Sequence, residues 1–132
     1  MCEFYNRQYK KSHNLDYRSL MPTNLFGYGD NYDLNSSHVI PALIKKIHEA
    51  KVLKKKSVEI WGTGRAKRDF LFVDDLAVVI EQVMKVSKNK FFLKNYNFKH
   101  MNIGSDQEIS IKVLVKLLCK IIGYKNKINY NT

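Results

Sequence analysis

The sequence predicts an α/β fold, in which short strands alternate with amphipathic helices along most of the chain. Two short segments, at residues 58–61 and 100–103, lead directly into glycines and are typical of strands. Around them, apolar residues recur at helical spacing, as they do over residues 39–47. Because the chain starts in a helical pattern and stops in a strand pattern, we expect a fold that is incomplete at both ends.

The first third of the chain is expected to hold a helix, a strand and a long loop. Residues 2–9 follow a partial helical pattern and lead into a polar connection over residues 10–14. A short strand over residues 17–21 then ends at Pro22, and a turn-rich loop follows over residues 22–30. The next helix is expected to begin at Ser37, whose hydroxyl can cap the free backbone N–H groups of the first turn. Its expected apolar face consists of Val39, Ile40, Leu43, Ile44 and Ile47.

The remaining elements continue the alternation of strands and helices. A strand over residues 69–73 precedes a helix that opens at Asp74 or Asp75 and runs through Met84. A final helix is expected between Ser110, as its N-cap, and Gly123, as its stop. Residues 127–130 begin another strand.

The composition favours an ordinary cytoplasmic protein with a basic surface. The net charge is +11, but arginine occurs only at positions 7, 18, 65 and 68, whereas readout of base edges favours arginine. Nucleic acid is therefore an unlikely partner, and a basic surface also suits a phosphorylated small substrate. No apolar run is long enough to span a membrane, and Cys2 and Cys119 are expected to be free thiols.

Two glycine pairs, at residues 27–29 and 62–64, lack the third glycine of a dinucleotide-binding fingerprint. Lys67 occupies that position after the second pair, and both pairs are better interpreted as turns. The chain also contains no Tyr-x-x-x-Lys, the catalytic pair of short-chain dehydrogenases.

Four motifs nevertheless resemble that superfamily. Residues 21–27 (Met-Pro-Thr-Asn-Leu-Phe-Gly) and residues 61–75, which begin with Trp-Gly-Thr-Gly, resemble extended short-chain dehydrogenases. Residues 5–9 and 36–43 narrow the resemblance to the GDP-L-fucose synthase family. The resemblance implies the late strands of a Rossmann-type sheet plus a small α/β substrate-binding subdomain. Residues 1–132 would then be a single substrate-side, C-terminal portion that lacks the N-terminal cofactor-binding half.

By this resemblance, the family uses NADPH to epimerise two carbons of GDP-4-keto-6-deoxy-mannose and to reduce its ketone. His38 matches the family's acid/base histidine, which also lies at the cofactor. Four consecutive residues match a loop against the nicotinamide end of NADP: Pro22, Thr23, Asn24 and Leu25. A histidine suits proton transfer because its unperturbed pKa lies near 6.5. From the residues alone, a solvent-facing histidine and an ordinary turn explain the same positions.

The resemblance also implies a GDP-sugar site. Arg68 and Trp61 match substrate-binding residues, and Lys46 stands where the family usually has arginine, which keeps the charge but loses the bidentate geometry. Core packing of Trp61 and a surface salt bridge from Arg68 to Asp69 or Asp74 are the alternatives. No metal site is expected.

The resemblance places the Gly-rich turn, a catalytic serine and cysteine and the Tyr/Lys pair before residue 1, and a further substrate-binding lysine after residue 132. The chain alone is therefore expected to be inactive, with a separate N-terminal half or a homodimer partner as its protein partner. Two alternatives stay open. One is part of another nucleotide-sugar epimerase or dehydratase, and the other is a non-catalytic basic module that binds anions or nucleic acid.

Overall fold

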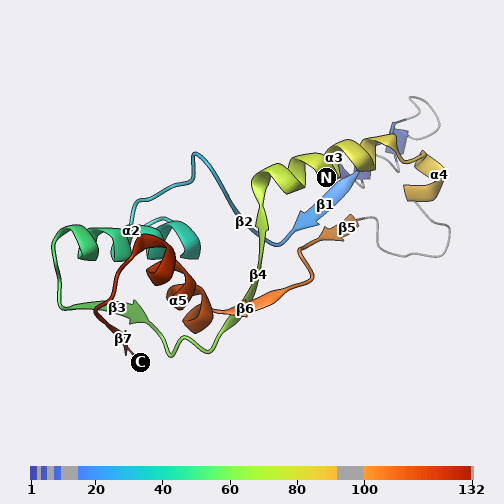
Figure 1. Ribbon diagram of the computed structural model, residues 1–132. Helices are drawn as coiled ribbons and strands as arrows, with labels where there is room; N and C mark the ends of the chain where they lie inside the picture. The colour runs from blue at the N-terminus through green and yellow to red at the C-terminus, as the bar shows by residue number, and fades with distance from the viewer. Residues whose placement is uncertain (3, 6–7, 10–14, 92–99, 132) are drawn as a thin grey trace. The chain divides into compact units, whose positions relative to one another are not determined.

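The computed structural model describes residues 1–2, 4–5, 8–9, 15–91 and 100–131. Strands and helices alternate along these residues, which confirms the predicted α/β fold (Figure 1). The chain divides into two compact units. Unit 1 combines Met1–Leu25 with Leu71–Gly104, and unit 2 combines Phe26–Phe70 with Ser105–Thr132.

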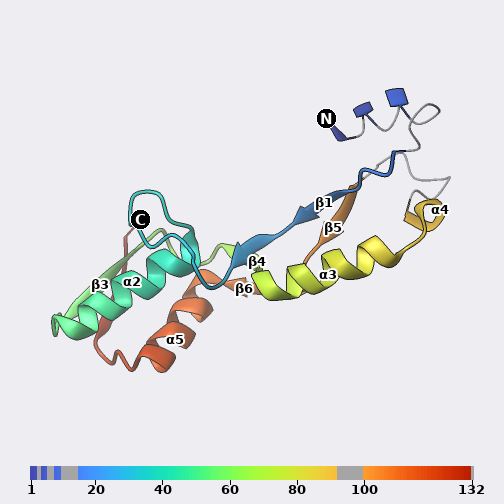
Figure 2. The same ribbon diagram turned by 90° about the horizontal axis from the view of Figure 1, so that it is seen from above.

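Unit 2 is built on a pair of parallel strands covered by two helices. Strand β3 (Ser57–Trp61) pairs in parallel with β7 (Lys127–Asn131). Helices α2 (Val39–Val52) and α5 (Ile111–Ile122) lie side by side in both views (Figures 1 and 2). Side chains of both helices and of β3 contribute to one buried core. The buried core residues are Ile40, Leu43, Ile47, Ala50, Val58, Ile60, Leu114, Val115, Leu118 and Tyr124.

The N-terminus of α5 is anchored by the loop that follows β3. The backbone N–H of Ile111 donates to Ala66 O at 3.0 Å, and that of Lys112 donates to Gly64 O at 2.9 Å. The hydroxyl of Ser110 accepts from the N–H of Val113 at 3.3 Å, as its predicted role as N-cap requires. At the other end of the helix, Gly123 has a φ of 79° and terminates α5, as predicted.

Three further strands form a separate sheet. Strand β4 (Lys67–Phe72) pairs antiparallel with β6 (Glu108–Ser110). With β2 (Asn24–Phe26), they form a three-stranded sheet in the order β2-β4-β6.

Unit 1 contains a second pair of parallel strands, together with two helices. Strand β1 (Ser19–Pro22) pairs with β5 (His100–Ile103), and the helices are α3 (Val73–Lys85) and α4 (Lys88–Phe91). Its buried apolar residues, among those that the structure describes, are Leu71, Val83 and Ile103. Among the described residues, no helix is long and apolar enough to cross a membrane.

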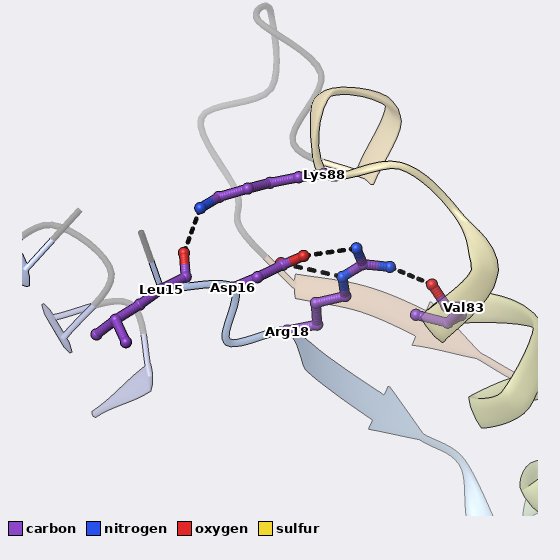
Figure 3. Close-up of polar contacts among 5 residues, drawn as sticks. All are labelled: Leu15, Asp16, Arg18, Val83 and Lys88. Carbon is purple, nitrogen blue, oxygen red and sulfur yellow. Dashed lines mark hydrogen bonds and ion pairs between the residues drawn. The ribbon is translucent and has the colours of Figure 1, made fainter. Parts of the chain in front are cut away.

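Arg18 fastens the start of β1 to the end of α3. Its side chain, only 8% exposed, donates to the Asp16 carboxylate at 2.7 and 3.1 Å and to the carbonyl of Val83 (Figure 3). The guanidinium also lies 5.1 Å from the ring centroid of Phe91. Lys88 donates to the carbonyl of Leu15 in the same region. These contacts tie the segment before β1 to the last turn of α3 and to α4.

Several local expectations were wrong. Ser37 does not cap α2, because the helix begins at Val39 and the residue before it is His38, whose side chain makes no capping bond. Helix α3 likewise begins at Val73 without a side-chain cap, and Asp74 and Asp75 lie inside its first turn. The expected loop over residues 22–30 contains β2, and the sequence did not predict β6 or α4. The described residues between positions 2 and 9 are helical, as expected, whereas residues 6–7 and 10–14 lie outside the described part.

Candidate functional site

Trp61 is an exposed aromatic ring at the carboxyl end of β3. Alternation along the strand buries Val58 and Ile60 and turns Trp61 outward, where it is 76% exposed. The Nζ atom of Lys46, on α2, lies 4.4 Å from the ring centroid, within the range of a cation–π contact. Trp61 is therefore no core residue. Together with Lys46 it forms a flat apolar surface beside a positive charge.

The loop after Trp61 is held tightly in place. Gly62 donates its N–H to Asn131 O at 2.7 Å, which extends the β3–β7 ladder past Trp61. Gly64 is buried with a φ of 73°, and a Cβ atom there would lie 2.6 Å from the ring of Tyr130. Burial raises the pKa of the Tyr130 phenol, as expected for a ring packed under this loop. The tight loop fixes the chain between Trp61 and Arg68.

Arg68 lies on the exposed part of β4, opposite Ile109 of β6. Its guanidinium donates to the carbonyl of Lys67 at 2.7 Å, which leaves most of its donors facing outward. The neighbouring carboxylate of Asp69 accepts hydrogen bonds from the backbone N–H of Ser105, at 3.1 and 3.2 Å, and from its hydroxyl. Asp69 thus joins β4 to the turn before β6, and this connection fixes the strand that carries Arg68.

His38 is the residue immediately before α2 and is exposed. Its carbonyl accepts from the N–H of Ala42 at 3.0 Å, while its side chain makes no capping bond. The hydroxyl of the preceding Ser37 is buried and has no partner among the described residues. A buried hydroxyl without a partner is uncommon in proteins, so the start of α2 is a place where a ligand would satisfy a free polar group.

The loop before His38 is ordered by one carboxylate. Asp33 accepts from the N–H of Asn35 at 2.8 Å and from the N–H and hydroxyl of Ser36, at 3.1 and 3.2 Å. The hydrogen bonds from Asn35 and Ser36 lower the pKa of Asp33 below its ordinary value. The turn remains formed while Asp33 is ionised, and it sets the direction in which the chain enters α2.

In unit 1, the predicted cofactor loop starts at the carboxyl end of β1. Thr23 donates its N–H to Ile103 O at 2.9 Å, which carries the β1–β5 ladder one residue beyond Pro22. The Thr23 hydroxyl is buried without a partner among the described residues, while Pro22 and Asn24 are exposed. Ligands of open α/β sheets bind outside the carboxyl ends of the strands. A free hydroxyl at such an end fits a polar group of a dinucleotide.

The eight predicted site residues fall into two sets. His38, Lys46, Trp61 and Arg68 belong to unit 2, and Pro22, Thr23, Asn24 and Leu25 belong to unit 1. Within unit 2, the structure brings Lys46 and Trp61 into direct contact. Among the described residues, no group of three or more His, Cys, Asp and Glu side chains could hold a metal ion.

Comparison with known families decides the classification. The model of the NAD dependent epimerase/dehydratase family matches residues 1–104. The chain belongs to this family. The match includes the motifs at residues 21–27 and 61–75, on which the resemblance was based.

The proteins similar to this chain include two GDP-L-fucose synthases and a GDP-mannoheptose C4 reductase. GDP-L-fucose synthase of Escherichia coli is 40% identical over 99% of this chain, and that of Sinorhizobium fredii is 42% identical over all of it. The chain spans 40% and 38% of the length of these two relatives. Among solved structures, the GDP-mannoheptose C4 reductase MlghC of Campylobacter jejuni, with NADP bound, has a TM-score of 0.77 and 32% identity. That match covers all of this chain and 46% of the reductase.

Three features of the candidate site were not predicted from the sequence. The contact of Lys46 with Trp61 joins residues that are 15 positions apart, and no local pattern signals it. The hydroxyl of Ser37, which has no partner among the described residues, was predicted to cap α2. The helix begins one residue too late for this role, so that His38 takes the N-cap position. The Asp69–Ser105 link spans 36 positions and depends on the β4–β6 pairing.

Proposed function

We propose that this chain is the substrate-side part of an enzyme similar to GDP-L-fucose synthase. The proposed reaction is the NADPH-dependent 3,5-epimerisation and 4-reduction of GDP-4-keto-6-deoxy-mannose. The identity of about 40% to GDP-L-fucose synthases supports it. The observation that carries it is the exposed ring of Trp61 with the Lys46 ammonium 4.4 Å from its centroid.

This pair suits a guanine nucleotide. An exposed indole ring offers a flat face on which a base can stack, and such stacking contributes about 1–3 kcal/mol per base in other proteins. A nearby ammonium attracts the diphosphate, and the outward-facing donors of Arg68 provide a fork for phosphate oxygens. Trp61, Lys46 and Arg68 would therefore bind the GDP part of the substrate.

His38 would act on the sugar. The protons on the two carbons beside the ketone are acidic, so a positioned acid/base can remove a proton from one face and another can return it on the opposite face. The imidazole of His38 is exposed and makes no capping bond to α2 that proton transfer would have to break. Its location immediately before α2, without a side-chain capping bond, leaves the imidazole available for a catalytic role.

Pro22, Thr23, Asn24 and Leu25 would contact the nicotinamide end of NADP. NADPH supplies the hydride that reduces the ketone. The contribution of this chain would be a polar edge at the end of β1, where the Thr23 hydroxyl is free to bond. We expect no turnover by the 132 residues alone, because they contain neither a Gly-rich fingerprint nor a Tyr-x-x-x-Lys pair.

Trp61 is the only tryptophan of the chain, so its fluorescence reports directly on the proposed nucleotide site. We expect GDP to quench this fluorescence in a saturable way. Lys46→Met and Arg68→Ala should each weaken GDP binding several-fold, since each removes a charge near the ring or the diphosphate. Lys45→Met and Arg65→Ala are matched controls, because they remove the same charges one and three positions away along the chain. Equal effects of the variants and their controls would contradict the assignment.

A further inference from the structure

The last 21 described residues of unit 2 carry charged side chains of one sign only, which is positive. Residues 111–131 contain five lysines and no aspartate or glutamate. Lys112, Lys116 and Lys120 follow one another at intervals of four along α5, and all three are exposed. Residues four apart lie on the same side of a helix with a rise of about 6 Å between them. None of the ion pairs between described residues engages these lysines.

A hollow of about 460 Å³ lies beside this row of lysines, between α5 and β7. The three lysines form part of its wall, and its apolar lining includes Val115, Cys119, Ile128 and Tyr130. All of these residues belong to unit 2, so the hollow is a feature of one compact unit. It offers apolar surface directly next to unpaired positive charge.

Apolar side chains also lie on the outer flank of α5. Val113, Leu117 and Ile121 are 53%, 48% and 71% exposed and, like the lysines, are spaced by four. They lie outside the core, which α5 fills with Leu114, Val115 and Leu118. On the helix surface, the lysine row therefore lies between the hollow and an exposed apolar stripe. A partner that carries both apolar and acidic side chains would match such a surface.

We propose that this surface, the α5 lysine face, binds an acidic amphipathic helix of another protein. Carboxylates at intervals of four on such a helix match the spacing of Lys112, Lys116 and Lys120, and apolar side chains of its inner face would enter the hollow. The proposal is independent of the GDP-sugar function, since it uses none of the residues assigned to that site.

The chemistry of the face favours a protein partner over the other anionic partners. Nucleic acid is recognised with arginine forks and base stacking, but residues 111–131 contain no arginine. A lipid surface is flat and offers no side chains to enter a hollow, whereas an amphipathic helix supplies both the apolar anchors and the carboxylates.

The test uses the complete chain and a labelled synthetic peptide. The peptide carries leucines at helical spacing (i, i+3, i+4, i+7) with glutamates on the flanking positions, and its binding is followed by fluorescence anisotropy. The test variant changes Lys112, Lys116 and Lys120 to glutamine. The matched control changes Lys54, Lys55 and Lys56, exposed lysines after α2, and so removes the same charge elsewhere.

We expect the test variant to lose about tenfold or more in affinity and the control variant no more than about twofold, since exposed ion pairs contribute modestly and add over three sites. A peptide with serine in place of leucine should bind the wild-type chain as weakly as the leucine peptide binds the test variant. Bound peptide should also slow alkylation of Cys119, which lines the hollow, and leave the exposed Cys2 unaffected.

Three results would overturn the proposal. One is an equal loss of affinity in the two triple variants, which would indicate unspecific attraction by net charge. Another is unchanged alkylation of Cys119 at saturating peptide. The third is binding of duplex DNA or of phosphatidylserine vesicles that depends on the three α5 lysines while the peptide does not bind.

Discussion

Replacing Gly64 by alanine should destabilise unit 2 far more than the same change at Gly62. Both glycines have a left-handed backbone, with φ values of 73° and 76°. An L-residue in this conformation costs about 1–2 kcal/mol, and this cost is common to both substitutions. Only at Gly64 would the new Cβ meet other atoms, at 2.6 Å from the Tyr130 ring and 3.3 Å from the Cβ of Lys112. Overpacking of this kind typically adds about 1–3 kcal/mol.

The assay is urea unfolding followed by circular dichroism. We expect Gly62→Ala to lower the free energy of unfolding by about 1–2 kcal/mol and Gly64→Ala by about 2–5 kcal/mol, which combines the two costs. In a Tyr130→Ala background, the extra cost at Gly64 should largely disappear, because the ring that the Cβ meets is gone. Equal costs for the two glycines in the wild-type background would refute the packing of this loop on β7.

Three further predictions concern other parts of the chain. The pKa of Asp16 is lowered chiefly by its hydrogen bond to Arg18, so the stability that it contributes is present above its ordinary pKa and is lost as the pH falls through the depressed one. Asp16→Asn should therefore give a flatter dependence of urea midpoint on pH below about pH 4, and an unchanged slope would contradict the Arg18 pairing. Cys119, whose pKa is raised by burial, should react with iodoacetamide at pH 8 more slowly than the exposed Cys2; peptide mapping that shows equal rates would exclude this burial. The chain should show no low-micromolar binding of NADPH in a fluorescence titration, because it contains no Gly-rich fingerprint, and such binding would disprove this expectation.

Elements with a clear spacing of apolar residues, and with residue types that mark their ends, could be predicted from the sequence. Helix α5 is the best case, since Ser110 and Gly123 mark its ends and both act as expected. Strand β5 also has the predicted bounds, residues 100–103. By contrast, β2 and β6 have three residues each, which is too short for alternation to be recognised. They exist because other strands pair with them, and such pairing is decided by the tertiary fold.

Residue types of the site could be predicted, but their geometry could not. The sequence placed His38 at the start of a helix, yet it assigned the cap to Ser37, because both residues precede the apolar pattern and only backbone angles separate them. The sequence did not decide whether Trp61 packs in the core or contacts the substrate. The exposed ring and its contact with Lys46 depend on how α2 crosses β3, which no local pattern specifies.

The proposed catalytic role of His38 is tested most directly by the exchange of solvent deuterium into the sugar. The measurement requires this chain fused to an N-terminal portion that carries the Gly-rich turn and the Tyr-x-x-x-Lys pair. Exchange reports proton removal beside the ketone and does not depend on the later reduction. General acid–base catalysis contributes about 10²–10⁴-fold, so His38→Asn should slow exchange by a factor in that range, while GDP binding at Trp61 barely changes. Exchange at the wild-type rate in the His38→Asn protein would contradict the assignment and leave His38 as a residue that only precedes α2.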